Sequence, residues 1–240
     1  SVNGDRDLAL LSLVEGDATQ VENEYTLRVM APLDLVGAML DSLGVLGGMS
    51  PTSPYLMHSL EFPYTSGGDF VAFLNEREGW EAVNEAYVHP SQSTEQIMHP
   101  DKYLAAEAPV PVVIPDLTGV IGADWTVLDE DVMGEFDLRE MLSVQLPAAR
   151  AGRAAAGWGG GSFRLYERGD QSLLVMSIAW ETKPDADEFS VAMQDGLEQR
   201  YGGGFDAGVP VSMLNSPDGF WSMAQNGNSV VTVLAVDGTL

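Results

Sequence analysis

The sequence has 240 residues, 45% of them hydrophobic, with 36 acidic against 11 basic side chains and a formal net charge of −25. So many apolar residues exclude a disordered acidic tail, because the chain can bury one large or two smaller cores. The charge argues against nucleic-acid binding, which needs a basic face, and the absence of cysteine excludes disulfides, thiolate metal sites and cysteine nucleophiles.

The acidic excess indicates a protein of a salt-saturated environment, such as that of a halophilic archaeon. Only Lys102 and Lys183 are lysines. Such a surface repels itself in dilute buffer but is screened at molar salt, where the Debye length is roughly 3 Å. A calcium-loaded extracellular protein is the alternative. No apolar run reaches the ~20 residues of a membrane span, and the start at Ser1 leads us to expect a processed form or a piece of a longer protein.

The first half of the chain predicts mainly helices, because apolar residues recur there at three- and four-residue steps. Helices are expected at 5–30, 33–46, 69–75, 79–87 and 91–98. Prolines 51, 54 and 63 predict an irregular segment before the third of these helices. Prolines 109, 111 and 115 predict an extended linker at 105–115, where the periodicity of the sequence changes from helical to mixed.

The second half predicts helices and strands joined by short turns. Helices are expected at 137–156 and 184–201, and strands at 125–128, 163–167, 173–180, 220–225 and 229–236. Short turns favour antiparallel pairing, and Trp180 should be largely buried. We therefore predict an α+β fold, with a helical domain at 1–108 and a domain at 116–240 whose antiparallel sheet carries two helices on one face.

Few residues show the spacing that catalysis or metal binding requires. His58, His89 and His99 lack the i, i+3 or i, i+4 spacing of a zinc pair, so capping or packing is the simpler interpretation. No G-x-S-x-G motif supports a serine triad. The acidic run 129–131 lacks the spacing of a calcium loop, and we expect it to form a solvated surface.

The segment 13–18 (LVEGDA) carries the sharpest motif. Glu15 lies beside the apolar stripe of its predicted helix, where an inward carboxylate needs a cation or several donors. We expect water, backbone donors or an arginine such as Arg28 or Arg77 to satisfy it. Gly16 costs about 1 kcal/mol against alanine in mid-helix, and the close approach of another backbone would explain it. An exposed glutamate and a tolerated glycine are the alternative.

Residues 15–18 (EGDA) resemble the E-G-x-A helix of gluzincin-type metallopeptidases, in which the glutamate is the third zinc ligand after an H-E-x-x-H helix. Further segments resemble the region after that helix in secreted or surface-anchored zincin-like proteins of archaea and bacteria. These segments are 62–64, 79–83, 93–100, 157–160, 180–182 and 185–189. The resemblance implies an extracellular or cell-surface location.

The chain departs from this family because it has no H-E-x-x-H motif. The resemblance therefore implies Glu15 as a zinc ligand only where an N-terminal portion supplies the histidines, with Asp17 holding one of them. We expect no catalytic residue and no cofactor in this chain itself, zinc in the complete precursor, and the chain's own N-terminal segment as a partner.

Three functions are consistent with these residues. The first is the C-terminal part of a secreted halophilic zincin-like metallopeptidase, which would not hydrolyse peptides on its own. The second is a non-catalytic extracellular surface or binding protein of a halophile. The third, a calcium-dependent adhesion module, rests on acidity alone. The natural ligand and the oligomeric state do not follow from the sequence.

Overall fold

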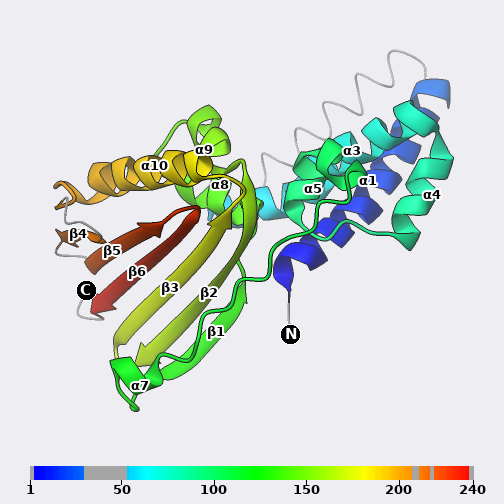
Figure 1. Cartoon of the computed structure of the whole chain (residues 1–240). Coiled ribbons are helices and arrows are strands. Elements are labelled where there is room, and N and C mark those ends of the chain that lie inside the picture. Colours follow the sequence, from blue (N-terminus) through cyan, green and yellow to red (C-terminus); the bar gives the residue numbers. More distant parts are fainter. Residues whose placement is uncertain (1–2, 30–52, 207–210, 217–218, 238–240) are drawn as a thin grey trace. The chain divides into compact units, whose positions relative to one another are not determined.

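Figure 1 shows the computed structural model, which describes residues 3–29, 53–206, 211–216 and 219–237. The chain divides into two compact units, here called the helical unit (residues 6–107) and the sheet unit (residues 1–5 and 108–240). The α+β class is confirmed, with helices in the first half and an antiparallel sheet in the second. The expected domains at 1–108 and 116–240 stay a prediction.

The helical unit is built from short and long helices around a core of buried apolar side chains. Its described helices are α1 (Gly4–Val29), α3 (Pro54–Glu78), α4 (Trp80–Val88), α5 (Thr94–Met98) and α6 (Pro100–Leu104). The helices predicted at 5–30, 79–87 and 91–98 are confirmed, and α6 was not predicted. The stretch predicted as helix at 33–46 lies outside the described residues.

The irregular segment expected around prolines 54 and 63 was a wrong prediction, because both prolines belong to α3. Pro54 occupies the first turn, where its missing N–H has no intrahelical partner to lose. Pro63 lies inside the helix, which normally costs about 3 kcal/mol. Phe62 and Pro63 are both buried, and this packing offsets the lost hydrogen bond.

Helices α1 and α3 touch backbone to backbone at two glycines. A methyl group on Gly16 would lie 2.2 Å from the carbonyl oxygen of Gly67, and one on Gly67 would lie 2.2 Å from the carbonyl oxygen of Ser12. Neither position has room for a side chain. The close approach predicted for Gly16 is confirmed, and its partner is a glycine of α3.

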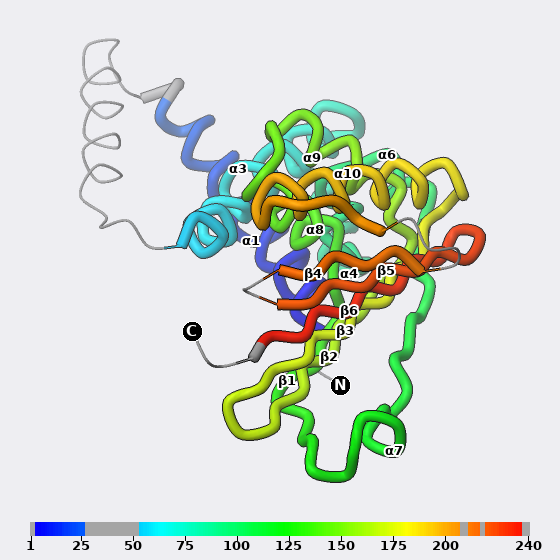
Figure 2. The backbone as a smooth tube through the Cα atoms, turned by 90° about the vertical axis from the view of Figure 1, so that its left-hand side faces the viewer, coloured from blue at the N-terminus to red at the C-terminus, as the bar shows by residue number. Residues whose placement is uncertain are grey.

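The sheet unit contains a six-stranded sheet in the order β1-β2-β3-β6-β5-β4, which Figure 2 shows from the side of β4. Every neighbouring pair is antiparallel. The strands are β1 (Thr126–Val132), β2 (Trp158–Arg168), β3 (Gln171–Trp180), β4 (Val211–Ser216), β5 (Gly219–Asn226) and β6 (Ser229–Asp237). The predicted hairpins are confirmed, whereas the edge strand β4 was missed.

Three helices pack on one face of this sheet, α8 (Glu135–Ser143), α9 (Ala148–Ala155) and α10 (Lys183–Tyr201), and the short α7 (Thr118–Ile121) precedes β1. The single helix predicted at 137–156 was wrong. The chain is non-helical at Leu146 and Pro147, since proline lacks the N–H that a continuous helix would need. Trp180 is buried against Phe189 of α10, as predicted.

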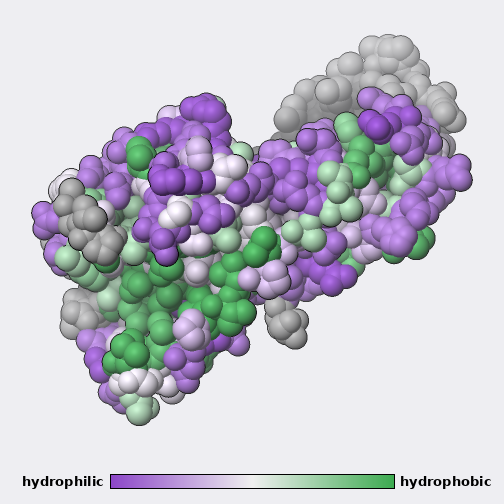
Figure 3. All heavy atoms as spheres, viewed as in Figure 1, coloured by the Kyte–Doolittle hydropathy of each residue, from purple (hydrophilic) through white to green (hydrophobic). Residues whose placement is uncertain are grey.

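The other face of the sheet has a smaller apolar cluster. Side chains alternate along β3, so Val175 points away from the helices and packs with Tyr166 and Ile114. Ile114 belongs to the extended segment after residue 107, whose lack of regular structure was predicted. Figure 3 shows hydrophobic residues gathered over the sheet, and Val231 of β6 is 39% exposed there.

Candidate functional site

Glu15 and Asp17 both lie at partly buried positions of α1, in the helical unit. The carboxylate of Glu15, through its charge and a hydrogen bond, raises the pKa of the exposed Tyr64 hydroxyl. The Tyr87 hydroxyl donates a hydrogen bond of 2.8 Å to Oδ2 of Asp17. Burial first, and then this hydrogen bond, raise the pKa of Tyr87 to about 12.

Arg77 and Arg28 were the arginines expected as partners of Glu15. Arg77 instead pairs with its neighbour Glu78 at 3.3 Å, and the side chain of Arg28 lies outside the described residues. The structure thus brings Glu15 together with a tyrosine hydroxyl. A phenol donor satisfies a carboxylate without neutralising its charge.

The three histidines lie on different elements of the helical unit. His58 belongs to α3, His89 ends α4 with its Nε2 3.2 Å from a carboxylate oxygen of Glu85, and His99 separates α5 from α6. Among the described residues, no histidine belongs to a group of three side chains close enough to share a metal ion. His89 and His99 occupy helix ends, as the sequence indicated.

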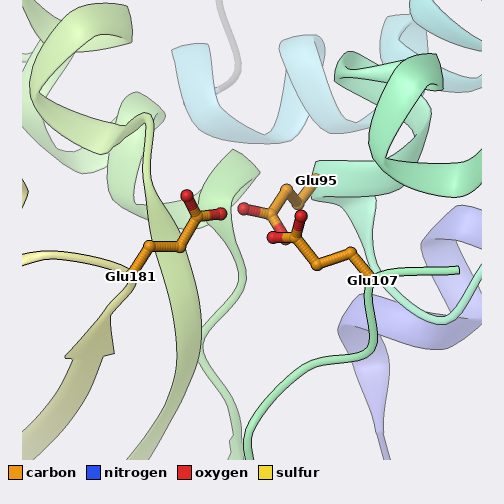
Figure 4. Close-up of side chains that lie close together, drawn as sticks. All are labelled: Glu95, Glu107 and Glu181. Carbon is orange, nitrogen blue, oxygen red and sulfur yellow. The ribbon is translucent and has the colours of Figure 1, made fainter. Parts of the chain in front are cut away.

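The helical unit contains a buried ion pair. Glu95 of α5 is 2% exposed, and its Oε1 lies 2.7 Å from Nζ of Lys102. Glu107 lies 3.4 Å from the same ammonium, and Figure 4 shows the two carboxylates turned toward each other. The ammonium of Lys102 lies beside both carboxylates, so Glu95, Glu107 and Lys102 form a structural ion-pair network of the helical unit.

The acidic run 129–131 serves the sheet unit itself. Asp131 accepts hydrogen bonds of 3.1 Å from the backbone N–H of Gly4 at the start of α1, where a helix favours negative charge. Glu130 pairs with Arg164 of β2. Asp129 accepts a hydrogen bond of 2.9 Å from the backbone N–H of Glu130, so all three carboxylates have partners within the protein.

A pocket of about 120 Å³ lies in the sheet unit between α8, α10 and β5. Its walls are mostly apolar, with Val144 and Gln145 just after α8 and Gly196 on α10. The larger wall residues are Met141, Leu142, Met193, Leu197, Tyr201 and Trp221. Apolar cavities of roughly 150 Å³ bind molecules of the size of benzene, so this pocket suits a short hydrocarbon group.

Two polar groups of this pocket lack the partners that such groups usually have. The indole N–H of Trp221 has no hydrogen-bond partner among the described residues, although the side chain is only 7% exposed. Arg200 lies over the ring of Tyr201, with its Cζ 5.3 Å from the ring centre. Tyr201 and Trp221 are neighbours, with ring centres 6.2 Å apart.

Sequence reasoning did not identify this pocket. Arg200 and Trp221 fall in the predicted helix 184–201 and the predicted strand 220–225, but the chain between them contains β4, which was missed. The only hint in the sequence was Trp221 near the start of the predicted strand 220–225. A tryptophan in a strand does not reveal which helix covers that strand.

Comparison with known proteins gives one family match, which lies in the sheet unit. Residues 125–239 match the model of a domain of unknown function, DUF8575, and this range holds all six strands. No curated protein matches the chain. Among solved structures, the chain is similar to the extracellular domain of PknH from Mycobacterium tuberculosis, with a TM-score of 0.38 and 9% identity over 56% of this chain and 90% of that one. A likeness this weak carries no argument about fold or function.

Proposed function

We propose that this chain is a non-catalytic extracellular binding protein, adapted to concentrated salt, whose ligand is a small apolar molecule. The pocket of the sheet unit carries this proposal. It is concave, its walls come from packed helices and a strand, and its mostly apolar lining includes a few polar residues, Gln145, Arg200 and Tyr201, which is the usual make-up of a ligand site.

The charge of the chain supports the salt-rich setting. Thirty-six carboxylates face eleven basic side chains, and this excess is tolerated where salt screens its repulsion. No helix among the described residues is long and apolar enough to cross a membrane. An extracellular location is part of the proposal and rests on the resemblance to secreted proteins.

Binding of 1-hexanol in molar KCl tests the proposed function, because this alcohol has the apolar group but no charge. We expect ligand-observed NMR to detect saturable binding. Val144→Trp should abolish it, since Val144 borders the pocket and is 59% exposed, so a larger side chain can fill the entrance without disturbing the core.

Val191→Trp is the matched control. Val191 is 55% exposed on α10 but does not line this pocket, so its variant should bind 1-hexanol like the wild type. Absence of saturable binding, or equal binding by the Val144 and Val191 variants, would rule out the pocket as the ligand site.

A zincin-like metallopeptidase fragment is the second candidate, favoured by the surroundings of Glu15. Its carboxylate is partly buried and has the Tyr64 hydroxyl as a partner, so its negative charge is still available to a metal ion. On a complete precursor, Glu15→Gln should lower the zinc content, because an amide is a poorer ligand than a carboxylate.

Glu22→Gln is the control for this measurement, since Glu22 is an exposed glutamate of the same helix. Its zinc content should equal that of the wild type. Equal zinc in the Glu15 variant and the wild type would remove the metallopeptidase interpretation.

A further inference from the structure

Arg200, at the rim of the pocket, differs from most basic residues of the chain. In the part of the chain that the structure describes, these basic side chains have a carboxylate within 4.0 Å: Arg77, Lys102, Arg139, Arg150, Arg153, Arg164, Arg168 and Lys183. Among the described residues, none lies that close to Arg200. In a protein with 36 acidic side chains, a guanidinium without a carboxylate at the mouth of an apolar pocket is available for an external anion.

Trp221 belongs to the same pocket wall as Arg200. Its ring is next to Tyr201, which Arg200 covers. Arg200 therefore brings a positive charge to the aromatic side of this pocket.

We infer that the pocket binds a short apolar carboxylate, and this inference rests on the proposed function. The hydrocarbon part lies among Met141, Met193 and Leu197. The carboxylate accepts hydrogen bonds from the guanidinium of Arg200. Guanidinium–carboxylate contacts are charge-assisted and geometrically specific, so they select an acid over an alcohol of the same length.

Comparison of hexanoate with 1-hexanol in molar KCl tests the inference. We expect hexanoate to bind about tenfold more tightly, the lower end of the effect of a hydrogen bond to a charged group. The indole N–H signal of Trp221 should move on addition of hexanoate, and Trp221→Phe identifies that signal among the five tryptophans.

Arg200→Gln is the decisive variant, because Arg200 is exposed and its loss leaves the core intact. Its affinity for hexanoate should fall about tenfold, to the level of 1-hexanol, whose own affinity should not change. Arg153→Gln is the control, since Arg153 is an exposed arginine of α9 outside this pocket. Acetyl-leucine in place of hexanoate distinguishes a peptide C-terminus from a free acid as the source of the carboxylate.

The results separate this inference from the proposed function. Equal affinities for hexanoate and 1-hexanol, or an Arg200 variant that binds hexanoate like the wild type, would overturn the carboxylate and leave an apolar pocket. Failure of both ligands to bind would overturn the proposed function as well. Stronger binding of the acid that depends on Arg200 supports both.

Discussion

At the scale of single residues, the contact between Gly16 and Gly67 limits what α1 can tolerate. By helix propensity alone, Gly16→Ala would stabilise the protein by about 1 kcal/mol. The added methyl group would instead lie 2.2 Å from a carbonyl oxygen of α3. We expect a loss of about 1–3 kcal/mol in the free energy of unfolding, measured by denaturant titration in molar KCl.

Gly152→Ala is the control for this substitution. Gly152 lies in α9, and a methyl group there would meet nothing within 4 Å, so this variant should be as stable as the wild type or slightly more stable. A Gly16 variant that shared this behaviour would show that the two helices can move apart without cost.

The hydrogen bond between Tyr87 and Asp17 predicts a pH dependence at the alkaline end. The pKa of Tyr87 rises from 10.0 to about 12 in the folded protein, so between these values the folded state holds a proton that the unfolded state has lost. The stabilisation is complete below pH 10 and is lost as the pH rises toward 12.

Thermal unfolding of the wild type and of Tyr87→Phe measures this effect. The wild type should lose stability between pH 10 and 12 more steeply than the variant, which lacks the titrating hydroxyl. Parallel curves would mean that the hydroxyl is as free to ionise in the folded state as in the unfolded one. Tyr64 and Tyr103 are present in both proteins and cancel in the comparison.

At the scale of elements, α10 depends on its first turn. The backbone N–H of Asp185 donates to the Thr182 hydroxyl at 3.4 Å, and the N–H of Thr182 donates to the Asp185 carboxylate at 3.0 Å. This reciprocal pair satisfies two donors that a helix start leaves without partners. The helix buries Phe189 and Met193 against the sheet, so fraying of its start loosens the main core.

Thr182→Ala should therefore lower the free energy of unfolding by about 1 kcal/mol. Thr182→Ser keeps the hydroxyl and should stay close to the wild type. Denaturant midpoints of the two variants provide the measurement, and equal midpoints would show that the hydroxyl does not contribute to the helix start.

At the scale of the whole molecule, the net charge of −25 predicts folding that depends on salt. The thermal midpoint should rise steeply from low to molar KCl, because screening removes the repulsion among surface carboxylates. Calorimetry over this range provides the measurement. A midpoint that does not change with KCl would contradict adaptation to a salt-rich environment.

The division into a helical unit and a sheet unit predicts where a protease cuts. The segment between residues 105 and 120 contains three prolines and little regular structure, and several of its residues are exposed, Val113 by 81%. Limited proteolysis should cut there first and release two resistant fragments. Early cleavage inside the sheet, for example at the β2–β3 turn, would contradict this boundary.

Several features of this protein followed from the sequence alone, because they depend on neighbours in the chain. Apolar spacing predicted α1, and Pro184 at the start and Gly202 past the end predicted α10. The short turns predicted the antiparallel β2–β3 and β5–β6 hairpins. Charge composition predicted the dependence on salt that awaits measurement. Gly16 indicated a close backbone contact, because a glycine inside a helix lowers its stability and a close contact explains why no larger residue is present.

Other features were decided by tertiary structure. Pro63 stays inside α3 because buried packing offsets a hydrogen bond that local rules count as lost, and β4 forms because β5 lies beside it. The pocket exists only where α8 and α10 cover β5, which brings Arg200 close to Trp221. These features depend on burial and on pairing between residues that are distant in the sequence, which periodicity and composition do not predict.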